Sequence, residues 1–144
     1  MYKIKVEHSF DSAHFLAGYS GKCANIHGHR WRVEVEISAP SVNEEGQSRG
    51  MVADFSDLKR DVRELLDYYD HALIIEEETL RKETLKCLIE DGFRVIKVTF
   101  RPTAENFSRF FYDSLCGKGY KVQRVTVYET PANSATYESD EVQA

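Results

Sequence analysis

Residues 29–38 alternate apolar with mostly charged side chains, and this alternation limits the possible fold more than any other feature of the sequence. Its apolar members are Trp31, Val33, Val35 and Ile37. Successive side chains of a β-strand point to opposite faces, so the pattern predicts a strand with one buried and one solvated face. Residues 2–6 alternate in the same way, which predicts another strand that runs on toward His14.

Two later segments have the apolar spacing of amphipathic helices. The first follows Asp54 or Ser56, either of which can cap it, and carries apolar side chains over residues 58–69. The second opens at Pro102-Thr103 and closes at a pair of glycines. The other expected elements are a loop over 39–49, a helix over 79–91 ended by Gly92, and strands over 95–100, 121–129 and 135–137.

This order of elements predicts an α+β fold. Two strands, then helices, then two strands indicate a four-stranded antiparallel sheet with helices on one face. Such a sheet has open edges that need to be covered or paired, and pairing between subunits would meet that need. At 144 residues with 42% hydrophobic content, the chain can build one core. We therefore expect a single domain over residues 1–138 and an acidic tail over 139–144.

Composition argues against several partners and locations. A net charge of −5 disfavours a general surface for nucleic acids or anionic membranes. The N-terminal residues contain no continuous apolar stretch, so we expect neither a signal peptide nor a membrane anchor. Three cysteines without regular spacing agree with a reducing compartment, and we expect a cytoplasmic protein. An anionic substrate would need a local basic patch; Lys22, Arg30 and Arg32 are the nearest candidates, and ordinary solvated charges are the alternative reading.

A cluster of metal-binding residue types falls within sixteen positions: His14, Cys23, His27 and His29. On an extended strand, His27 and His29 project from the same face. Three neutral imidazoles can bind Zn²⁺ and leave a fourth position open, as in catalytic sites, although two histidines on a strand can also be plain surface residues. The chain has no Cys-x-x-Cys element, so Cys23 is better explained as a nearby base or nucleophile than as a fourth ligand.

Carboxylates and one further histidine complete the candidate residues. Asp70 can orient the neighbouring His71, although a histidine at a helix C-terminus can simply complement the helix dipole. Glu105 stands in the first turn of its helix, where complementing the dipole is again the alternative. Glu129 shares the parity of Val127 on its strand, and an inward carboxylate is costly unless it is paired or binds something.

Taken in order, these residues form a set that covers nearly the whole chain. The set is His14, Cys23-x-x-x-His27-Gly28-His29, Asp54-Phe55, Asp70-His71, Pro102-Thr103-Ala104-Glu105-Asn106 and Tyr128-Glu129-Thr130. It resembles the 6-pyruvoyl-tetrahydropterin synthase family; no single motif is decisive, but the ordered set is highly specific. The resemblance implies the tunnelling fold, or T-fold, in which three subunits join their antiparallel sheets into a barrel and two trimers usually stack.

The resemblance also implies roles for individual residues. It implies Zn²⁺ ligands at His14, His27 and His29, an active-site thiol at Cys23, and an Asp70–His71 pair that reaches a site formed with a neighbouring subunit. It further implies pterin anchors at Glu105 and Glu129, with Thr103 beside them. The expected partners are a pterin triphosphate substrate and identical subunits, in a trimer or hexamer.

The three-residue spacing between Cys23 and His27 is similar to that of the bacterial branch of the family, whereas the animal pyruvoyl-forming members have a longer spacing. The bacterial branch implies conversion of 7,8-dihydroneopterin triphosphate to 6-carboxy-5,6,7,8-tetrahydropterin, with loss of acetaldehyde and triphosphate, on the route to queuosine. Two alternatives stay open: a pyruvoyl-forming enzyme of the same fold, and a non-catalytic pterin or metal-binding module that would gain nothing from Cys23 and His71.

Overall fold

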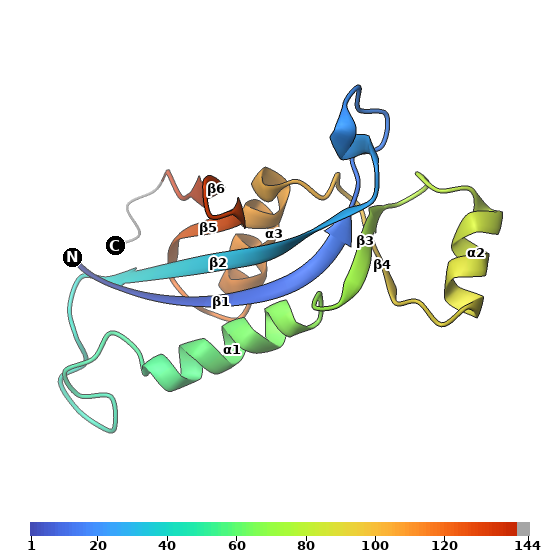
Figure 1. Cartoon of the computed structure of the whole chain (residues 1–144). Helices are drawn as coiled ribbons and strands as arrows, with labels where there is room; N and C mark the ends of the chain where they lie inside the picture. Colours follow the sequence, from blue (N-terminus) through green and yellow to red (C-terminus); the bar gives the residue numbers. More distant parts are fainter. Residues whose placement is uncertain (141–144) are drawn as a thin grey trace.

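A mixed six-stranded sheet organises the fold (Figure 1). The computed structural model describes residues 1–140; residues 141–144, in the expected tail, lie outside the described part. Its strands are β1 (Tyr2–His14), β2 (His27–Ala39), β3 (Ala72–Glu76), β4 (Val95–Val98), β5 (Val122–Thr130) and β6 (Asn133–Glu138), and its helices are the short 3-10 helix η1 (Lys22–Ala24), α1 (Phe55–Asp67), α2 (Lys82–Glu90) and α3 (Ala104–Gly117). The strand order across the sheet is β4-β3-β1-β2-β5-β6.

Strands β1, β2, β5 and β6 form the antiparallel sheet that the sequence predicts. Phe10 of β1 is the Cα partner of Trp31 of β2, and Val33 of β2 is the partner of Val127 of β5. The apolar parity of each strand therefore falls on one face. The expected α+β class is confirmed.

The strand count differs from the expected four, because β3 and β4 extend the sheet in parallel with β1. The sequence reasoning missed β3 altogether and left the strand near Val95 outside the sheet. Residues 72–75 follow α1 almost directly and are apolar without alternation, which is typical of strands in a parallel arrangement. Such a short run cannot be told from a buried helix segment by periodicity.

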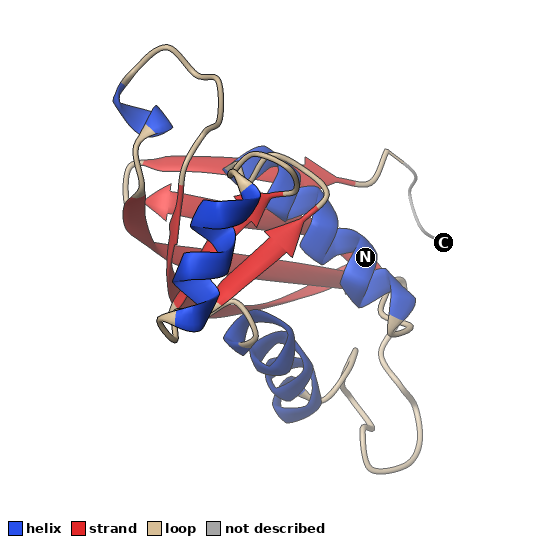
Figure 2. Ribbon diagram, turned by 90° about the vertical axis from the view of Figure 1, so that its right-hand side faces the viewer, coloured by secondary structure: helices blue, strands red, loops and turns tan. Residues whose placement is uncertain are grey.

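The core lies between the sheet and the two longer helices, α1 and α3, which lie on one of its faces (Figures 1 and 2). The rings of Phe10 and Trp31 stack with their centroids 6.1 Å apart, and Phe107 of α3 packs edge-on against both. All three side chains are almost fully buried. Helix α2 has no buried residue and stands apart beside β3 and β4 (Figure 1).

Both long helices begin where the sequence predicts, with Asp54 and Thr103 as their N-caps. The Asp54 carboxylate accepts a hydrogen bond from the Ser56 amide at 2.7 Å, and the Thr103 hydroxyl accepts one from the Asn106 amide at 3.2 Å. These caps satisfy amides that have no partner within the helix. None of the helices among residues 1–140 combines the length and apolar content needed to cross a bilayer.

One side-chain hydrogen bond ties α1 to the segment that follows α3. The Tyr120 hydroxyl donates to the carboxylate of Asp61. This hydrogen bond is the main reason why the pKa of Asp61 lies below its ordinary value of 3.8. Burial, together with the same carboxylate, raises the pKa of Tyr120 to about 12. The pair is therefore an ionised acceptor and a neutral donor at neutral pH.

We expect Tyr120→Phe to lower the free energy of unfolding by about 1 kcal/mol at pH 7. A carboxyl whose pKa is depressed on folding contributes stability above its unfolded pKa and loses it as the pH falls through the folded pKa. The difference between the two proteins should therefore shrink below about pH 4, where the unfolded carboxyl takes up its proton. Urea unfolding at pH 7 and pH 3 measures this, with exposed Tyr2→Phe as the control. An equal difference at both pH values would contradict the prediction.

Candidate active site

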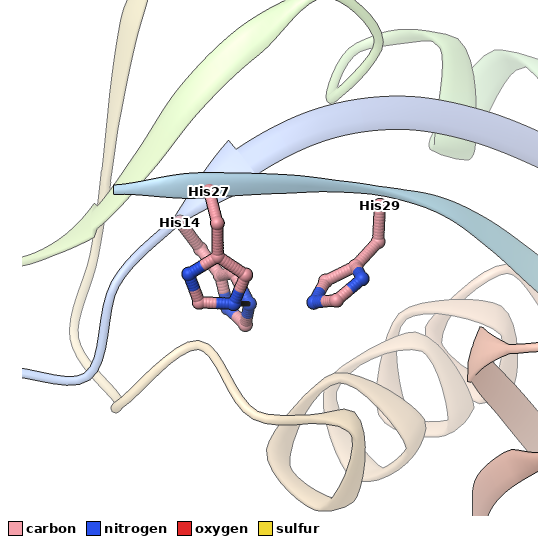
Figure 3. A group of neighbouring side chains, drawn as sticks. All are labelled: His14, His27 and His29. Carbon is pink, nitrogen blue, oxygen red and sulfur yellow. Dashed lines mark hydrogen bonds between the residues drawn. The ribbon is translucent and has the colours of Figure 1, made fainter. Parts of the chain in front are cut away.

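Three histidine side chains converge where β1 ends and β2 begins (Figure 3). His14 is the last residue of β1 and the Cα partner of His27, the first residue of β2; His29 lies two residues further along the same face. The ring nitrogens that could bind a metal all lie within 4.8 Å of one another. The sheet register thus brings together the three ligands expected from the sequence.

Hydrogen bonds to backbone carbonyls determine which nitrogen of two rings carries the proton. The Nδ1 atom of His14 lies 2.7 Å from the Pro102 carbonyl oxygen, and that of His27 lies 2.7 Å from the Asn25 carbonyl oxygen. A carbonyl only accepts, so both Nδ1 atoms carry hydrogen, and in the neutral rings both Nε2 atoms present lone pairs. These two Nε2 atoms are 3.0 Å apart. Two facing lone pairs at this distance need a proton or a cation beside them.

The ring of His29 also indicates a cation at this position. The Nε2 atom of His29 is buried and has no hydrogen-bond partner. Glu129 lies beside it, with a carboxylate oxygen 3.7 Å from this nitrogen and 3.6 Å from Nε2 of His14. A buried polar atom without a partner costs about 1–3 kcal/mol. A cation among the three Nε2 atoms would satisfy all of them, so the residues present fit a bound metal ion.

Burial keeps these imidazoles in the form that binds metals. It lowers the pKa of His14 to about 4, against the opposing effect of the Pro102 carbonyl. Burial also lowers the pKa of His29, with Glu129 opposing. A metal ligand must be unprotonated, so both side chains are ready to bind at neutral pH. Imidazole nitrogens suit Zn²⁺ and the neighbouring divalent transition metals.

Cys23 lies on the loop that joins the histidine-bearing ends of β1 and β2. It is part of η1 and is partly exposed, and its carbonyl accepts a hydrogen bond from the Leu16 amide at 2.9 Å. Among the described residues, the group able to hold a metal contains the three histidines and not this thiol. The arrangement leaves Cys23 available for a role other than ligation.

The three residues expected to bind a pterin line one cavity of about 240 Å³. Thr103 and Glu105 reach it from the start of α3, and Glu129 from the end of β5. Glu129 also lies beside the histidines, so the cavity adjoins the candidate metal site. The structure therefore brings together two carboxylates from segments that are distant in sequence.

The Asp70–His71 pair lies on a different face of the sheet. His71 borders a shallow depression with Asp11 and Arg30, which occupy the parity opposite to the inward-facing His14 and His29. The Nδ1 atom of His71 is 2.8 Å from a carboxylate oxygen of Asp70, whose other oxygen accepts from the Asp11 amide at 2.8 Å. These hydrogen bonds, that of Asp11 first, lower the pKa of Asp70. His71 is not part of the histidine cluster of the same chain, although His29 also lines the depression that it borders.

Two of the three residues of the candidate basic patch, Arg30 and Arg32, form ion pairs on this open face, and the third, Lys22, lies in η1. Arg30 pairs with Asp11 at 3.0 Å, and Arg32 pairs with Glu7 at 3.1 Å and with Glu34. Cross-strand pairs of this kind agree with the reading of these arginines as ordinary solvated charges.

Sequence reasoning missed the groups that orient the candidate residues. The carbonyls of Pro102 and Asn25 hold His14 and His27, and a backbone carbonyl has no residue-type signature. Arg94 donates to the Asp70 carbonyl from 24 positions away, and nothing in its local sequence marks it. The only available signal was Pro102 itself, because a fixed turn before a helix is a plausible place for an exposed carbonyl.

Comparison with known proteins gives consistent results. The family described as 6-pyruvoyl tetrahydropterin synthase matches residues 3–140. The 6-carboxy-5,6,7,8-tetrahydropterin synthase of Haemophilus influenzae is 38% identical to this chain, over 96% of this chain and 99% of its own length. The enzyme of the same name from Aquifex aeolicus is 32% identical, over 83% of this chain and 77% of its own length.

Solved structures agree with the fold. An uncharacterized protein from Wolinella succinogenes superposes with a TM-score of 0.79 at 21% identity, covering 96% of this chain and 98% of that chain. The 6-pyruvoyl tetrahydropterin synthase of Caenorhabditis elegans superposes with a TM-score of 0.68 at 26% identity, covering 96% of each chain. The expected T-fold is confirmed. With this fold, and with the family match spanning nearly its whole length, the chain belongs to the 6-pyruvoyl tetrahydropterin synthase family.

Proposed function

We propose that this protein converts 7,8-dihydroneopterin triphosphate to 6-carboxy-5,6,7,8-tetrahydropterin, releasing acetaldehyde and triphosphate, with Zn²⁺ held by His14, His27 and His29. The observation that carries the proposal is the cluster of three Nε2 atoms beside a cavity lined by two carboxylates. The two bacterial relatives named for this reaction support the 6-carboxy branch, as does the spacing of Cys23 and His27. We further propose that the protein acts in the cytoplasm, on the route to queuosine.

The cavity at the start of α3 suits the guanidine-like edge of a pterin ring. Glu105 and Glu129 can each accept hydrogen bonds from adjacent N–H donors, as a carboxylate does from a guanidinium. Thr103 caps α3 and thereby fixes the first turn, which carries Glu105. The substrate side chain would then extend from the carboxylates toward the histidines, since Glu129 borders both.

Cys23 and His71 are the proposed proton-transfer groups. When bound, Zn²⁺ supplies Lewis-acid polarisation of the substrate side-chain oxygens. Cys23, on the loop between the histidines, acts as the base that removes a side-chain proton. Asp70 accepts the Nδ1 hydrogen of His71, which leaves Nε2 of that ring free to move protons to and from the substrate hydroxyls.

The two faces of the sheet support a site shared between subunits. His71 lies on the open face and the histidine cluster on the helix-covered face, so a second chain would have to supply the Asp70–His71 pair. Among the described residues, the open edges of the antiparallel strands are β6 and the part of β1 before Ser12, which pairs only with β2, and both can pair with another chain. We propose a trimer or hexamer in which the four antiparallel strands of each chain join a common barrel.

Product analysis tests the reaction. Incubation of the purified protein with 7,8-dihydroneopterin triphosphate should release acetaldehyde and 6-carboxy-5,6,7,8-tetrahydropterin in equal amounts, measured by chromatography and an aldehyde assay. Formation of 6-pyruvoyl-tetrahydropterin without acetaldehyde would assign the chain to the pyruvoyl-forming reaction. Pterin binding without any turnover would favour a non-catalytic module.

Metal analysis tests the histidine cluster. Protein purified without chelators should contain close to one Zn²⁺ per chain. His29→Ala should weaken metal binding by more than the roughly 10- to 100-fold that loss of an outer hydrogen-bond partner costs, because a direct ligand is lost. His8→Ala is the matched control, since His8 pairs with Asp67 of α1 and is not part of the histidine cluster. Full turnover by a metal-free preparation would refute the metal requirement.

Mixing of inactive variants tests the shared site. Cys23→Ala and His71→Ala should each lose roughly 2–4 orders of magnitude in rate, the usual contribution of a positioned acid or base. Both should still bind Zn²⁺. After verified subunit exchange, a mixture should regain part of the activity, because some sites then combine an intact thiol with an intact histidine. Cys87→Ala, in exposed α2, is the control. No recovery would place all the groups in one chain.

A further inference from the structure

Arg94 joins the end of α1 from a distant part of the chain. Its guanidinium donates to the carbonyl of Asp70 at 2.7 Å and to the carbonyl of Tyr68. It also lies over the Tyr68 ring, 5.2 Å from the ring centroid. The Arg94 residue immediately precedes β4, and its own carbonyl accepts from the Leu73 amide at 3.0 Å. The β3–β4 extension of the sheet therefore delivers this side chain to the turn before β3.

The turn between α1 and β3 contains carbonyls that the helix itself cannot satisfy. The last carbonyls of a helix have no partner within it, and α1 has no basic residue in its last turn. Arg94 supplies donors to the carbonyls of the C-cap residue Tyr68 and of Asp70, and it places a positive charge near the negative end of the helix dipole. The Ser12 hydroxyl donates to the Tyr69 carbonyl between them. Side chains from β1 and from the residue before β4 thus hold three consecutive carbonyls.

The residue that follows these carbonyls is His71, and its backbone is in the left-handed region with φ of 53°. This conformation is uncommon for any residue other than glycine and persists when its surroundings hold it. The His71 amide donates to the Asp11 carbonyl at 2.6 Å, and the Asp70 carboxylate accepts from the Asp11 amide. Strand β1 holds the pair on one side, and Arg94 holds the preceding turn on the other.

We infer that Arg94 is a positioning residue, which fixes the Asp70–His71 pair by bridging the carbonyls of Tyr68 and Asp70. The inference rests on the proposed function for the role of His71. A planar guanidinium can reach two carbonyls at once, whereas a single amide or ammonium group does not reproduce this fork. Without the bridge, His71 can leave its left-handed backbone conformation. Its imidazole would then no longer point toward the site of the neighbouring subunit.

The variant Arg94→Gln tests this inference kinetically. We expect kcat to fall roughly 10- to 100-fold, which is the effect of a displacement of about 1 Å in a reacting group. KM, zinc content and oligomeric state should stay as in the wild type, because neither the histidine cluster nor the cavity at α3 contains Arg94. Added guanidinium, below concentrations that unfold the protein, should restore part of kcat. Arg60→Gln is the matched control, since Arg60 lies on α1, the helix whose end Arg94 contacts, and pairs with Asp57 and Asp61.

Each outcome of this experiment decides the inference. A wild-type kcat in Arg94→Gln would overturn it. It would also be overturned if kcat fell in step with the melting temperature in both Arg94→Gln and Arg60→Gln and guanidinium restored none of it. A crystal structure of Arg94→Gln gives a readout independent of activity: His71 should leave the left-handed region, and an unchanged backbone there would overturn the inference. If the wild-type protein does not turn over the pterin substrate, the proposed function fails, and the conformation of His71 alone decides whether Arg94 positions it.

Discussion

The antiparallel pairing of β1 with β2 is the interaction on which the rest of the structure depends. Its register sets Phe10 opposite Trp31 and His14 opposite His27, so one alternation of side chains produces both the core and the candidate metal site. A shift by one residue would turn the histidines to solvent together with the core side chains of that strand. Selection for a buried core on these strands therefore also preserves the geometry of the ligands.

The site continues the aromatic core. The ring of His14 lies edge-on to Trp31 with centroids 4.9 Å apart, and that of His29 with centroids 5.3 Å apart. Contact with this apolar layer keeps water away from the imidazoles and lowers their affinity for protons. The same burial leaves lone pairs without partners, which is unfavourable for folding. This local destabilisation lies at a position where a bound ligand can offset it, as is typical of functional sites.

Much of this organisation could be predicted from the sequence, because it depends on local patterns. Alternation identified β1 and β2, and capping residues such as Asp54 marked the start of a helix. The parity of Glu129 indicated an inward carboxylate, which the structure places beside two histidines. The ordered set of motifs indicated the family. These features are encoded within a few residues of where they act.

The remainder depends on contacts between distant segments. The short apolar run that forms β3 has no periodicity of its own, and its parallel pairing is decided by the approach of β1. The carbonyl of Pro102 orients His14 from 88 positions away, and Arg94 reaches Tyr68 across 26 positions. No local pattern records either contact. The position of Asp70–His71 on the opposite face also required the sheet topology.

The placement of the histidines at the two ends of the loop over residues 15–26 has a consequence for the loop itself. A metal ion bound to His14 and His27 is a cross-link that closes this loop, and so reduces the entropy that the segment can gain by opening locally. Cys23 lies inside the closed segment. The order of the loop that carries the thiol is then coupled to occupancy of the metal site, although the sulfur is not among the ligands.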